Sequence, residues 1–241
     1  MMNLEAEFAK RGPWITHFVV DGVKSGGSFH ALEDERIDQF FESFPNVRSI
    51  LELGSLEGGH SFALARRPTI ERVLGVEARA TNIARARFVQ ELLRIDNANF
   101  VEVNLENADL TTFGKFDAVF CSGLLYHLPE PWRLIEQIPR IAPRLFIWTH
   151  YADENPDSLT MNGLKGREYV EGGSDEPLSG VSPKSFWLTL DSLKKVLTNA
   201  GFDSIRVLHD DPKHCHGPAV TLAAMMQSAV AGDHERNLAF G

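Results

Sequence analysis

The chain has 241 residues, of which 43% are hydrophobic and 24% are charged, and its net charge is −9. A chain of this length and composition is typical of a soluble globular protein with one sizeable core. The acidic balance counts against an overall basic field that would attract nucleic acid or an anionic membrane. Two cysteines are too few for a disulfide framework. The amino terminus lacks the apolar core of a secretory signal and no apolar run could span a bilayer, so we expect a cytoplasmic protein without a membrane segment.

The first 46 residues precede the regular part of the chain. Residues 4–11 form a short amphipathic segment, and residues 14–20 are strand-like and run into the turn signal Asp21-Gly22. The loop that follows ends at His30, and it suits either a lid over a site or a plain surface loop. Apolar residues at helical spacing then predict a helix over 33–44.

Residues 50–61 read as a buried strand that passes through a glycine-rich turn into a helix. Such a turn lets a nucleotide cofactor lie against bare backbone. The next strand-like run ends at Glu77, about twenty residues further on, where a ribose diol would need a hydrogen-bond acceptor. The alternative is that Glu77 is a solvated residue at a strand end.

From residue 47 the pattern alternates between strands and helices. This alternation predicts a parallel sheet with helices on both faces, joined by right-handed crossovers. The expected strands span 48–53, 72–76, 99–103, 116–121 and 144–149, and the expected helices span 60–67, 80–94 and 131–141.

The alternation of strands and helices is interrupted at residues 150–186. We expect these residues to form turns and short strands that shape a substrate pocket. A helix over 190–200 follows, and then strands over 204–208 and 219–225 that should pair as an antiparallel hairpin. The chain is expected to be a single domain, with an N-terminal lid and helices (1–46), a cofactor-binding half (47–149), a substrate-side insertion (150–186), a closing helix and hairpin (187–226) and a poorly ordered tail (227–241).

Five motifs occur in a characteristic order, at residues 52–58, 75–77, 116–121, 124–128 and 193–202. In this order and spacing they resemble the class I S-adenosylmethionine-dependent methyltransferases, over roughly residues 47–226. The resemblance implies a Rossmann-like, seven-stranded, mostly parallel sheet with helices on both faces and an antiparallel last strand. The cofactor it implies is S-adenosylmethionine.

The spacing of the turn agrees with that cofactor. The dinucleotide fingerprint is absent, because Ser55 and Leu56 stand where closer glycines would be needed for a pyrophosphate. S-adenosylmethionine carries no phosphate and demands less of the turn. The resemblance implies cofactor contacts from Glu52, Gly54 and Gly58 in the turn, from Glu77 at the ribose, from Asn104 and Leu105 at the adenine, and from Ser122 near the methionine end. Asn104 stands where the family often has an acid.

Methyl transfer to an oxygen requires alignment of the reactants and removal of a proton. His127 is the first candidate for this base because it lies just after the fourth strand; its alternative role is structural, as a cap on the turn at 129–131. His150, at the end of the fifth strand, and His30, from the N-terminal loop, are further candidates. Trp148 and Trp187 suit either the wall of a sugar-like substrate site or the core.

The hairpin turn holds His214 and His216 near several aspartates, which raises the question of a metal. His-x-His alone lacks the spacing of a zinc site, so a metal is not favoured. The predicted function is methyl transfer from S-adenosylmethionine to a hydroxyl or amine of a small molecule, a sugar or secondary metabolite, in a chain compatible with a homodimer. An RNA nucleotide methyltransferase and a non-catalytic, cofactor-binding partner subunit remain alternatives, and the acidic charge makes nucleic acid the weaker one. The glycine spacing disfavours an NAD-dependent dehydrogenase.

Overall fold

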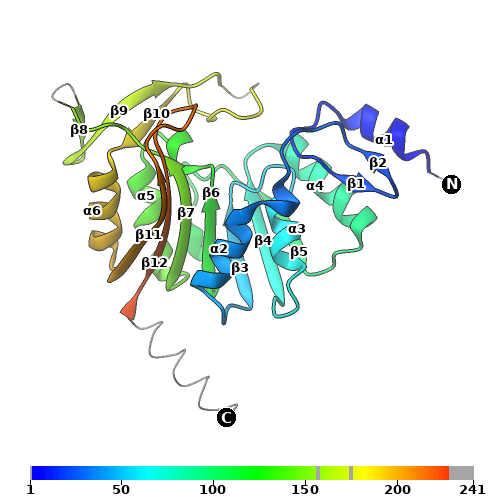
Figure 1. Ribbon diagram of the computed structural model, residues 1–241, viewed down its shortest axis with the longest axis horizontal. Helices are drawn as coiled ribbons and strands as arrows, with labels where there is room; N and C mark the ends of the chain where they lie inside the picture. The colour runs from blue at the N-terminus through cyan, green and yellow to red at the C-terminus, as the bar shows by residue number, and fades with distance from the viewer. Residues whose placement is uncertain (1, 156–157, 174–175, 228–241) are drawn as a thin grey trace, which may run out of the picture. The chain divides into compact units, whose positions relative to one another are not determined.

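The computed structural model describes residues 2–155, 158–173 and 176–227. The chain forms two compact units, residues 1–104 and residues 105–241 (Figure 1). The division into lid, cofactor-binding half, insertion and closing hairpin within one domain stays a prediction. The tail predicted to be poorly ordered comprises residues 227–241, and all of these except Gln227 lie outside the described residues.

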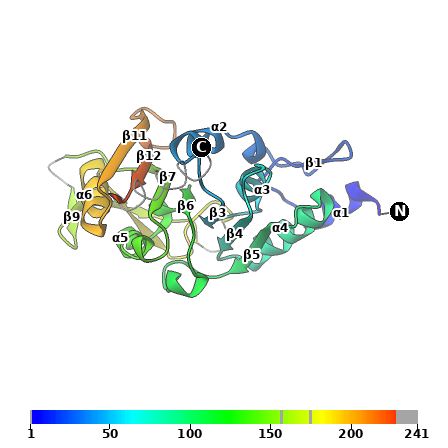
Figure 2. The ribbon, with the colours of Figure 1, turned by 90° about the horizontal axis from the view of Figure 1, so that it is seen from below.

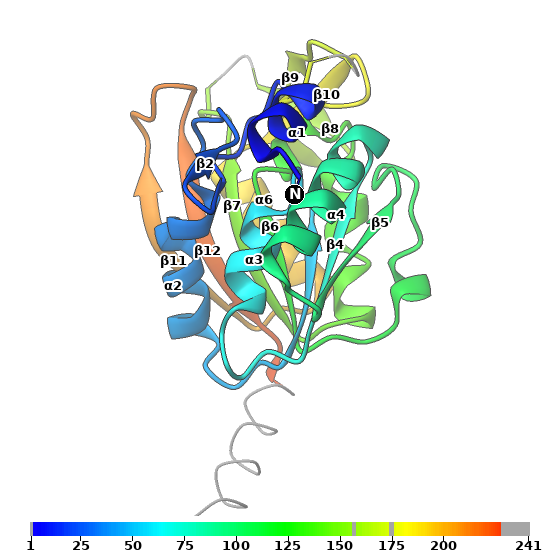
Figure 3. The ribbon, with the colours of Figure 1, turned by 90° about the vertical axis from the view of Figure 1, so that its right-hand side faces the viewer.

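The first unit is built on the parallel strands β3, β4 and β5, in that order. Leu53 pairs with Val76 and Glu77 with Glu102, so the carboxyl ends of the three strands meet at one edge. In Figure 3, α2 lies beside α3. The helices are α1 (Leu4–Arg11), α2 (Glu35–Ser43), α3 (Gly59–Ala65) and α4 (Ala80–Leu93), with a 3-10 turn η1 (Ala31–Glu33), and the strands are β1 (Val19–Val20), β2 (Val23–Lys24), β3 (Ser49–Leu53), β4 (Arg72–Glu77) and β5 (Ala98–Glu102).

The prediction of a strand over residues 14–20 is mostly wrong, because β1 includes only Val19–Val20. The backbone amides of Ile15 and Thr16 donate to the carboxylate of Glu57 instead of to a neighbouring strand. The turn signal is confirmed. Asp21 and Gly22 both have positive φ, 49° and 80°, the backbone that a tight hairpin turn between β1 and β2 requires.

The second unit contains two sheets. In the first, β6 and β7 are parallel, and β12 pairs antiparallel with both β7 and β11, which confirms the predicted hairpin. The second sheet is antiparallel, in the order β8, β9, β10, and it occupies the predicted insertion. Figure 2 shows α5 and α6 side by side. The strands are β6 (Ala118–Ser122), β7 (Arg144–His150), β8 (Leu159–Met161), β9 (Leu164–Val170), β10 (Lys184–Leu188), β11 (Ser204–Asp211) and β12 (Ala219–Met225).

The helices of this unit match the predictions except in one place. α6 (Leu190–Ala200) has the predicted bounds, and its N-cap Thr189 accepts a hydrogen bond from the Ser192 amide. The helix expected over 131–141 is broken. Pro139 lacks the amide that would bond to Ile135 and its ring clashes there, so α5 ends at Ile135. The remaining elements are α5 (Pro131–Ile135) and the 3-10 turns η2 (Leu110–Phe113), η3 (Leu125–His127) and η4 (Ile138–Arg140).

Strands β3 of the first unit and β6 of the second are buried on both faces, whereas β5 is buried on one face only. Ile50, Leu51 and Leu53 of β3 are fully buried, as is typical of strands covered by helices on both sides. In the second unit Phe120 and Phe146 stack with ring centroids 5.2 Å apart. Among the described residues, no helix has the length and apolar character that crossing a bilayer requires.

Candidate active site

The turn between β3 and α3 holds three residues with left-handed backbone. Gly54 has φ of 79°, Leu56 of 48° and Gly58 of 83°. At Gly58 a Cβ atom would also lie 2.8 Å from the ring of Phe100, so glycine is required there for two reasons. Leu56 is an unusual residue for this conformation, and its amide donates a hydrogen bond of 3.0 Å to Glu77 Oε2. The predicted cofactor turn is therefore a strained loop held in place by Glu77.

Glu77 is buried, with 6% of its surface exposed, and is not the solvated strand end of the alternative. Its second oxygen, Oε1, accepts from the Arg79 amide at 2.9 Å. Burial raises the pKa of Glu77, although the backbone hydrogen bonds from Arg79 and Leu56 oppose the rise. Each carboxylate oxygen can accept more than one hydrogen bond, so the residue can hold the turn and still receive a ribose hydroxyl. Its contact with the ribose stays a prediction.

Glu52 lies at the centre of a buried network that sequence reasoning did not find. Ser61 Oγ donates to Glu52 Oε2, and His60 Nδ1 lies 3.8 Å from Glu52 Oε1. His60 Nε2 lies 2.9 Å from Asp34 Oδ2, which also pairs with Arg36. The position of His60, directly after the glycine-rich turn, was the available signal.

The charge state of Glu52 follows from this environment. Burial raises the pKa of Glu52 to about 8, with the Ser61 hydrogen bond opposing the rise and the charge of Glu77 adding to it. Burial lowers the pKa of His60, against the hydrogen bond to Asp34. Glu52 therefore holds a proton at neutral pH in the free protein. A cationic cofactor beside it would favour the carboxylate.

This proton makes stability depend on pH. The folded-state pKa of about 8 lies above the ordinary value of 4.5, so the contribution of Glu52 is complete below pH 4.5 and is lost as the pH rises through 8. Urea unfolding between pH 5 and 8.5 should show the free energy of unfolding of wild type falling relative to Glu52→Gln, by at most about 1.4 kcal/mol per pH unit. Parallel curves for the two proteins would contradict the assignment.

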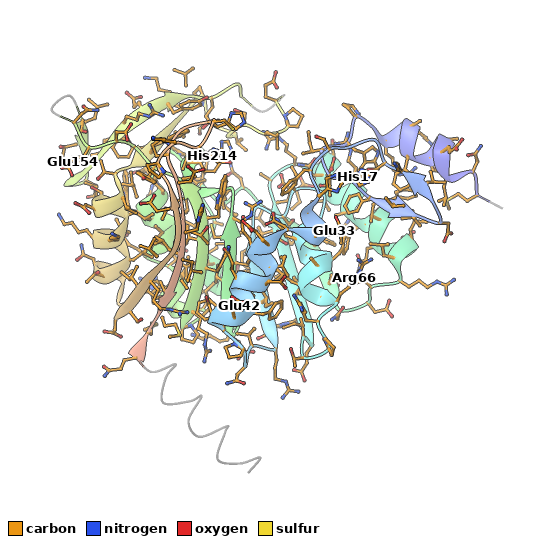
Figure 4. All side chains as sticks on the ribbon, in the orientation of Figure 1. His17, Glu33, Glu42, Arg66, Glu154 and His214 are labelled. Atoms are coloured by element: carbon orange, nitrogen blue, oxygen red, sulfur yellow. The ribbon has the colours of Figure 1, made fainter. Side chains whose placement is uncertain are left out.

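The other predicted residues of the first unit are His30 and Asn104. The His30 side chain is 62% exposed, and its Nδ1 lies 3.4 Å from Glu33 Oε2. Its ring packs against that of His17, with centroids 4.4 Å apart; His17 and Glu33 are labelled in Figure 4. Asn104 is partly buried just beyond β5. The catalytic hypothesis for His30 and the adenine contact of Asn104 stay predictions.

The second unit contains a histidine–carboxylate pair. His127, the last residue of η3, has its Nδ1 3.1 Å from Glu171 Oε2. The Glu171 side chain is only 2% exposed, whereas that of His127 is 18% exposed. Glu171 also accepts from Ser185 Oγ at 2.5 Å, from Ser179 Oγ at 2.7 Å and from the Gly180 amide at 2.7 Å. The carboxylate is thus held by four donors from different parts of the chain.

This arrangement determines what the imidazole can do. Burial alone would raise the pKa of Glu171, but hydrogen bonds from Ser185, Gly180 and Ser179 and the charge of His127 lower it below its ordinary value. A carboxylate at Nδ1 favours the tautomer with the proton on that atom, and in this tautomer Nε2 is the ring nitrogen that carries the lone pair. The pairing with Glu171 is compatible with a general base, and both this role and the turn-capping alternative for His127 stay predictions. Sequence reasoning missed Glu171, which follows β9 in the irregular insertion.

Tyr126 brings His127 and His150 into one aromatic cluster. Its ring centroid lies 4.1 Å from that of His127 and 4.6 Å from that of His150. Trp187 stacks on His150 at 5.1 Å and is 3% exposed, so it belongs to the core. Trp148 is partly buried, with its ring 5.1 Å from that of His150. The two histidines predicted in this unit are thus brought together.

The ring of His150 is held by a backbone hydrogen bond and by stacking with Trp187. Its Nδ1 lies 2.9 Å from the carbonyl oxygen of Gly217, and therefore donates to it. Burial lowers the pKa of His150, with the bonds to Pro218 and Gly217 opposing the change. Its ring also contacts that of His214, at 5.0 Å, and Figure 4 shows His214 at the turn between β11 and β12. Across the described part of the chain, no group of three or more His, Cys, Asp or Glu side chains is arranged to hold a metal ion.

The remaining predicted cofactor residues, Leu105 and Ser122, lie in the second unit, Ser122 as the last residue of β6. Both are buried, at 6% and 9% exposure. Within the first unit, Ser55 Oγ is a buried atom of the cofactor turn with no hydrogen-bond partner among the described residues. A buried hydroxyl without a protein partner can hydrogen-bond to a bound ligand or an ordered water.

Comparison with known proteins agrees with this geometry. Residues 47–172, which are more than half of the chain, match the family described as a methyltransferase domain. The chain belongs to the class I S-adenosylmethionine-dependent methyltransferases. As a member of this methyltransferase family, it is similar to the N-terminal domain of EvdMO1, solved with S-adenosylhomocysteine (SAH) and D-fucose. The two are 33% identical over 94% of this chain and 98% of that one, with a TM-score of 0.85.

The similarity to that domain confirms the predicted Rossmann-like fold, with three strands of the seven-stranded sheet in the first unit and four in the second. It also confirms the predicted methyl donor, because the EvdMO1 domain was solved with SAH, the demethylated product of S-adenosylmethionine. The methyltransferase is 23% identical over 171 residues to a tRNA U34 carboxymethyltransferase of Alteromonas mediterranea. It is 27% identical over 169 residues to a ubiquinone biosynthesis O-methyltransferase of Psychrobacter arcticus. It spans 46% and 63% of the lengths of these two relatives.

Proposed function

We propose that this protein transfers a methyl group from S-adenosylmethionine to a hydroxyl of a small, sugar-like molecule. The observation that carries the proposal is the His127–Glu171 pair, because a hydroxyl must lose its proton to become methylated, whereas a neutral amine can react without a base. The similarity to the N-terminal domain of EvdMO1, solved in the presence of D-fucose, supports a sugar as the acceptor.

The residues of each unit would contribute differently. Glu52, Gly54, Gly58, Glu77 and Asn104 of the first unit would hold the cofactor. The contacts of Leu105 and Ser122 in the second unit stay predictions. Bound S-adenosylmethionine supplies a methyl group that its sulfonium already activates.

The protein then has to align the reactants and take up a proton. His127 Nε2 accepts the proton of the acceptor hydroxyl as its oxygen bonds to the methyl carbon. Glu171 holds the ring through Nδ1 and stabilises the imidazolium that forms.

The proposal can be tested with the whole protein. Calorimetry should detect binding of S-adenosylmethionine and SAH in the micromolar range, and a chromatographic assay should show methylated product from D-fucose or a related deoxyhexose. Absence of cofactor binding would refute the proposal. Cofactor binding without turnover on any hydroxyl acceptor would favour the non-catalytic partner subunit.

Two further arms of the assay separate the remaining alternatives. We expect full activity in EDTA, since the His-x-His at residues 214–216 lacks the spacing of a zinc site; loss of activity without unfolding would show a metal requirement. We expect no methylation of bulk tRNA, because the net charge of −9 opposes binding to a polyanion. Methylated tRNA would replace the sugar with RNA as the acceptor.

A further inference from the structure

The cofactor turn carries a second acidic residue, Glu57, whose hydrogen-bond partners differ from those of Glu52. Its side chain is fully buried. One oxygen, Oε2, accepts from the amides of Thr16 at 2.7 Å and Ile15 at 3.1 Å. The other, Oε1, accepts from Arg85 Nη1 at 3.0 Å. The turn is thus bonded directly to the N-terminal segment.

Arg85 completes this connection from α4. It is 8% exposed, and its Nε donates to the carbonyl oxygen of Arg11 at 2.7 Å. Its guanidinium carbon lies 5.6 Å from the ring centroid of Trp14, a distance at which cation–π attraction contributes. One buried ion pair therefore ties residues 11–16, the N-terminal clamp, to the cofactor turn.

The N-terminal clamp also packs against the start of α3. A Cβ atom on Gly59 would lie 2.9 Å from Thr16 Cγ2 and 2.5 Å from Ala31 Cβ. Any outward movement of the clamp would remove the packing against the residue that follows Gly58. The same turn contains Leu56, which has left-handed backbone and whose amide donates to Glu77.

We propose that Glu57 and Arg85 are positioning residues for the cofactor: their ion pair fixes the turn at residues 54–58 by anchoring the N-terminal clamp to it. This inference rests on the proposed function, since it assumes that the turn binds S-adenosylmethionine. In this inference the N-terminal clamp supports the cofactor turn through fixed hydrogen bonds. It does not act as a freely hinged lid. Neither side chain touches the reacting atoms.

The test compares Arg85→Gln with wild type. Removing the cation leaves the Glu57 carboxylate buried without its partner, so the turn should loosen. We expect SAH to bind at least 10-fold more weakly and the KM for S-adenosylmethionine to rise, with kcat at saturating cofactor unchanged. Hydrogen exchange should quicken at the amides of residues 15, 16 and 56. The double variant Glu57→Gln, Arg85→Gln removes both charges and should recover part of the affinity.

Arg48→Gln is the matched control, because Arg48 forms an exposed pair with Glu71 in the same unit and its loss should leave SAH binding unchanged. A lower melting temperature of Arg85→Gln with unchanged SAH affinity would overturn the inference and show a purely structural pair. If Arg85→Gln does not fold, the double variant Glu57→Gln, Arg85→Gln, which lacks the ion pair without leaving a buried charge, should still bind SAH more weakly than wild type; equal affinity would overturn the inference. Failure of wild type to bind SAH would instead refute the proposed function.

Discussion

Replacing His127 with glutamine is expected to lower kcat by about 10²- to 10⁴-fold, which is the usual contribution of general base catalysis. The affinity for S-adenosylmethionine should stay within twofold of wild type, because the role proposed for His127 concerns the proton of the acceptor. Steady-state kinetics with saturating cofactor and SAH calorimetry measure the two quantities separately. The acidic limb of the pH–rate profile, which reports protonation of the base, should disappear in the variant.

Glu171→Gln tests whether the carboxylate acts through His127. The amide can still accept a hydrogen bond from His127 Nδ1, but it does not stabilise the imidazolium, so kcat should fall less than in His127→Gln. Because the two residues act as a unit, the double variant should be no slower than His127→Gln alone. His209→Gln is a suitable control, since His209 is an exposed histidine of β11. Unchanged kcat in His127→Gln would exclude His127 as the base.

Replacing Glu77 with alanine should weaken binding of S-adenosylmethionine by about 1–3 kcal/mol, the range for loss of a buried hydrogen-bonding partner. This corresponds to a rise in Kd of about 5- to 150-fold. Two effects add: the ribose loses its acceptor, and the amides of Leu56 and Arg79 lose the oxygens that hold the turn and the start of α4. Calorimetry of the variant with the cofactor measures the sum.

Glu77→Gln separates these two effects in part, since its single carbonyl oxygen can still bond one of the two amides. The matched control is Glu102→Ala, because Glu102 pairs with Glu77 in the register of β4 and β5 but is exposed. We expect no change in affinity for this control. Wild-type affinity in Glu77→Ala would exclude the ribose contact and leave Glu77 with a role in the turn alone.

Much of the chain could be predicted because its signals are local. The glycine-rich turn after β3, the helix over 190–200 and the hairpin of β11 and β12 were each predicted from residues that lie close together in sequence. The two exceptions have different causes, one local and one not. Pro139 interrupts a helix whose apolar periodicity continues, and the amides of Ile15 and Thr16 have a partner that lies 41 or more residues away.

The sequence by itself determined the nucleotide turn, the acid at residue 77 and the histidine after the fourth strand, because each belongs to a short motif with fixed spacing. Only the tertiary structure decided the partners of these residues. Glu171 reaches His127 from an insertion 44 residues away, and Arg85 reaches Glu57 of the cofactor turn from α4. Such pairs depend on how distant elements pack. Their polar groups are stable in the interior only when the fold supplies a complementary charge or hydrogen bond, and spacing along the chain does not encode that match.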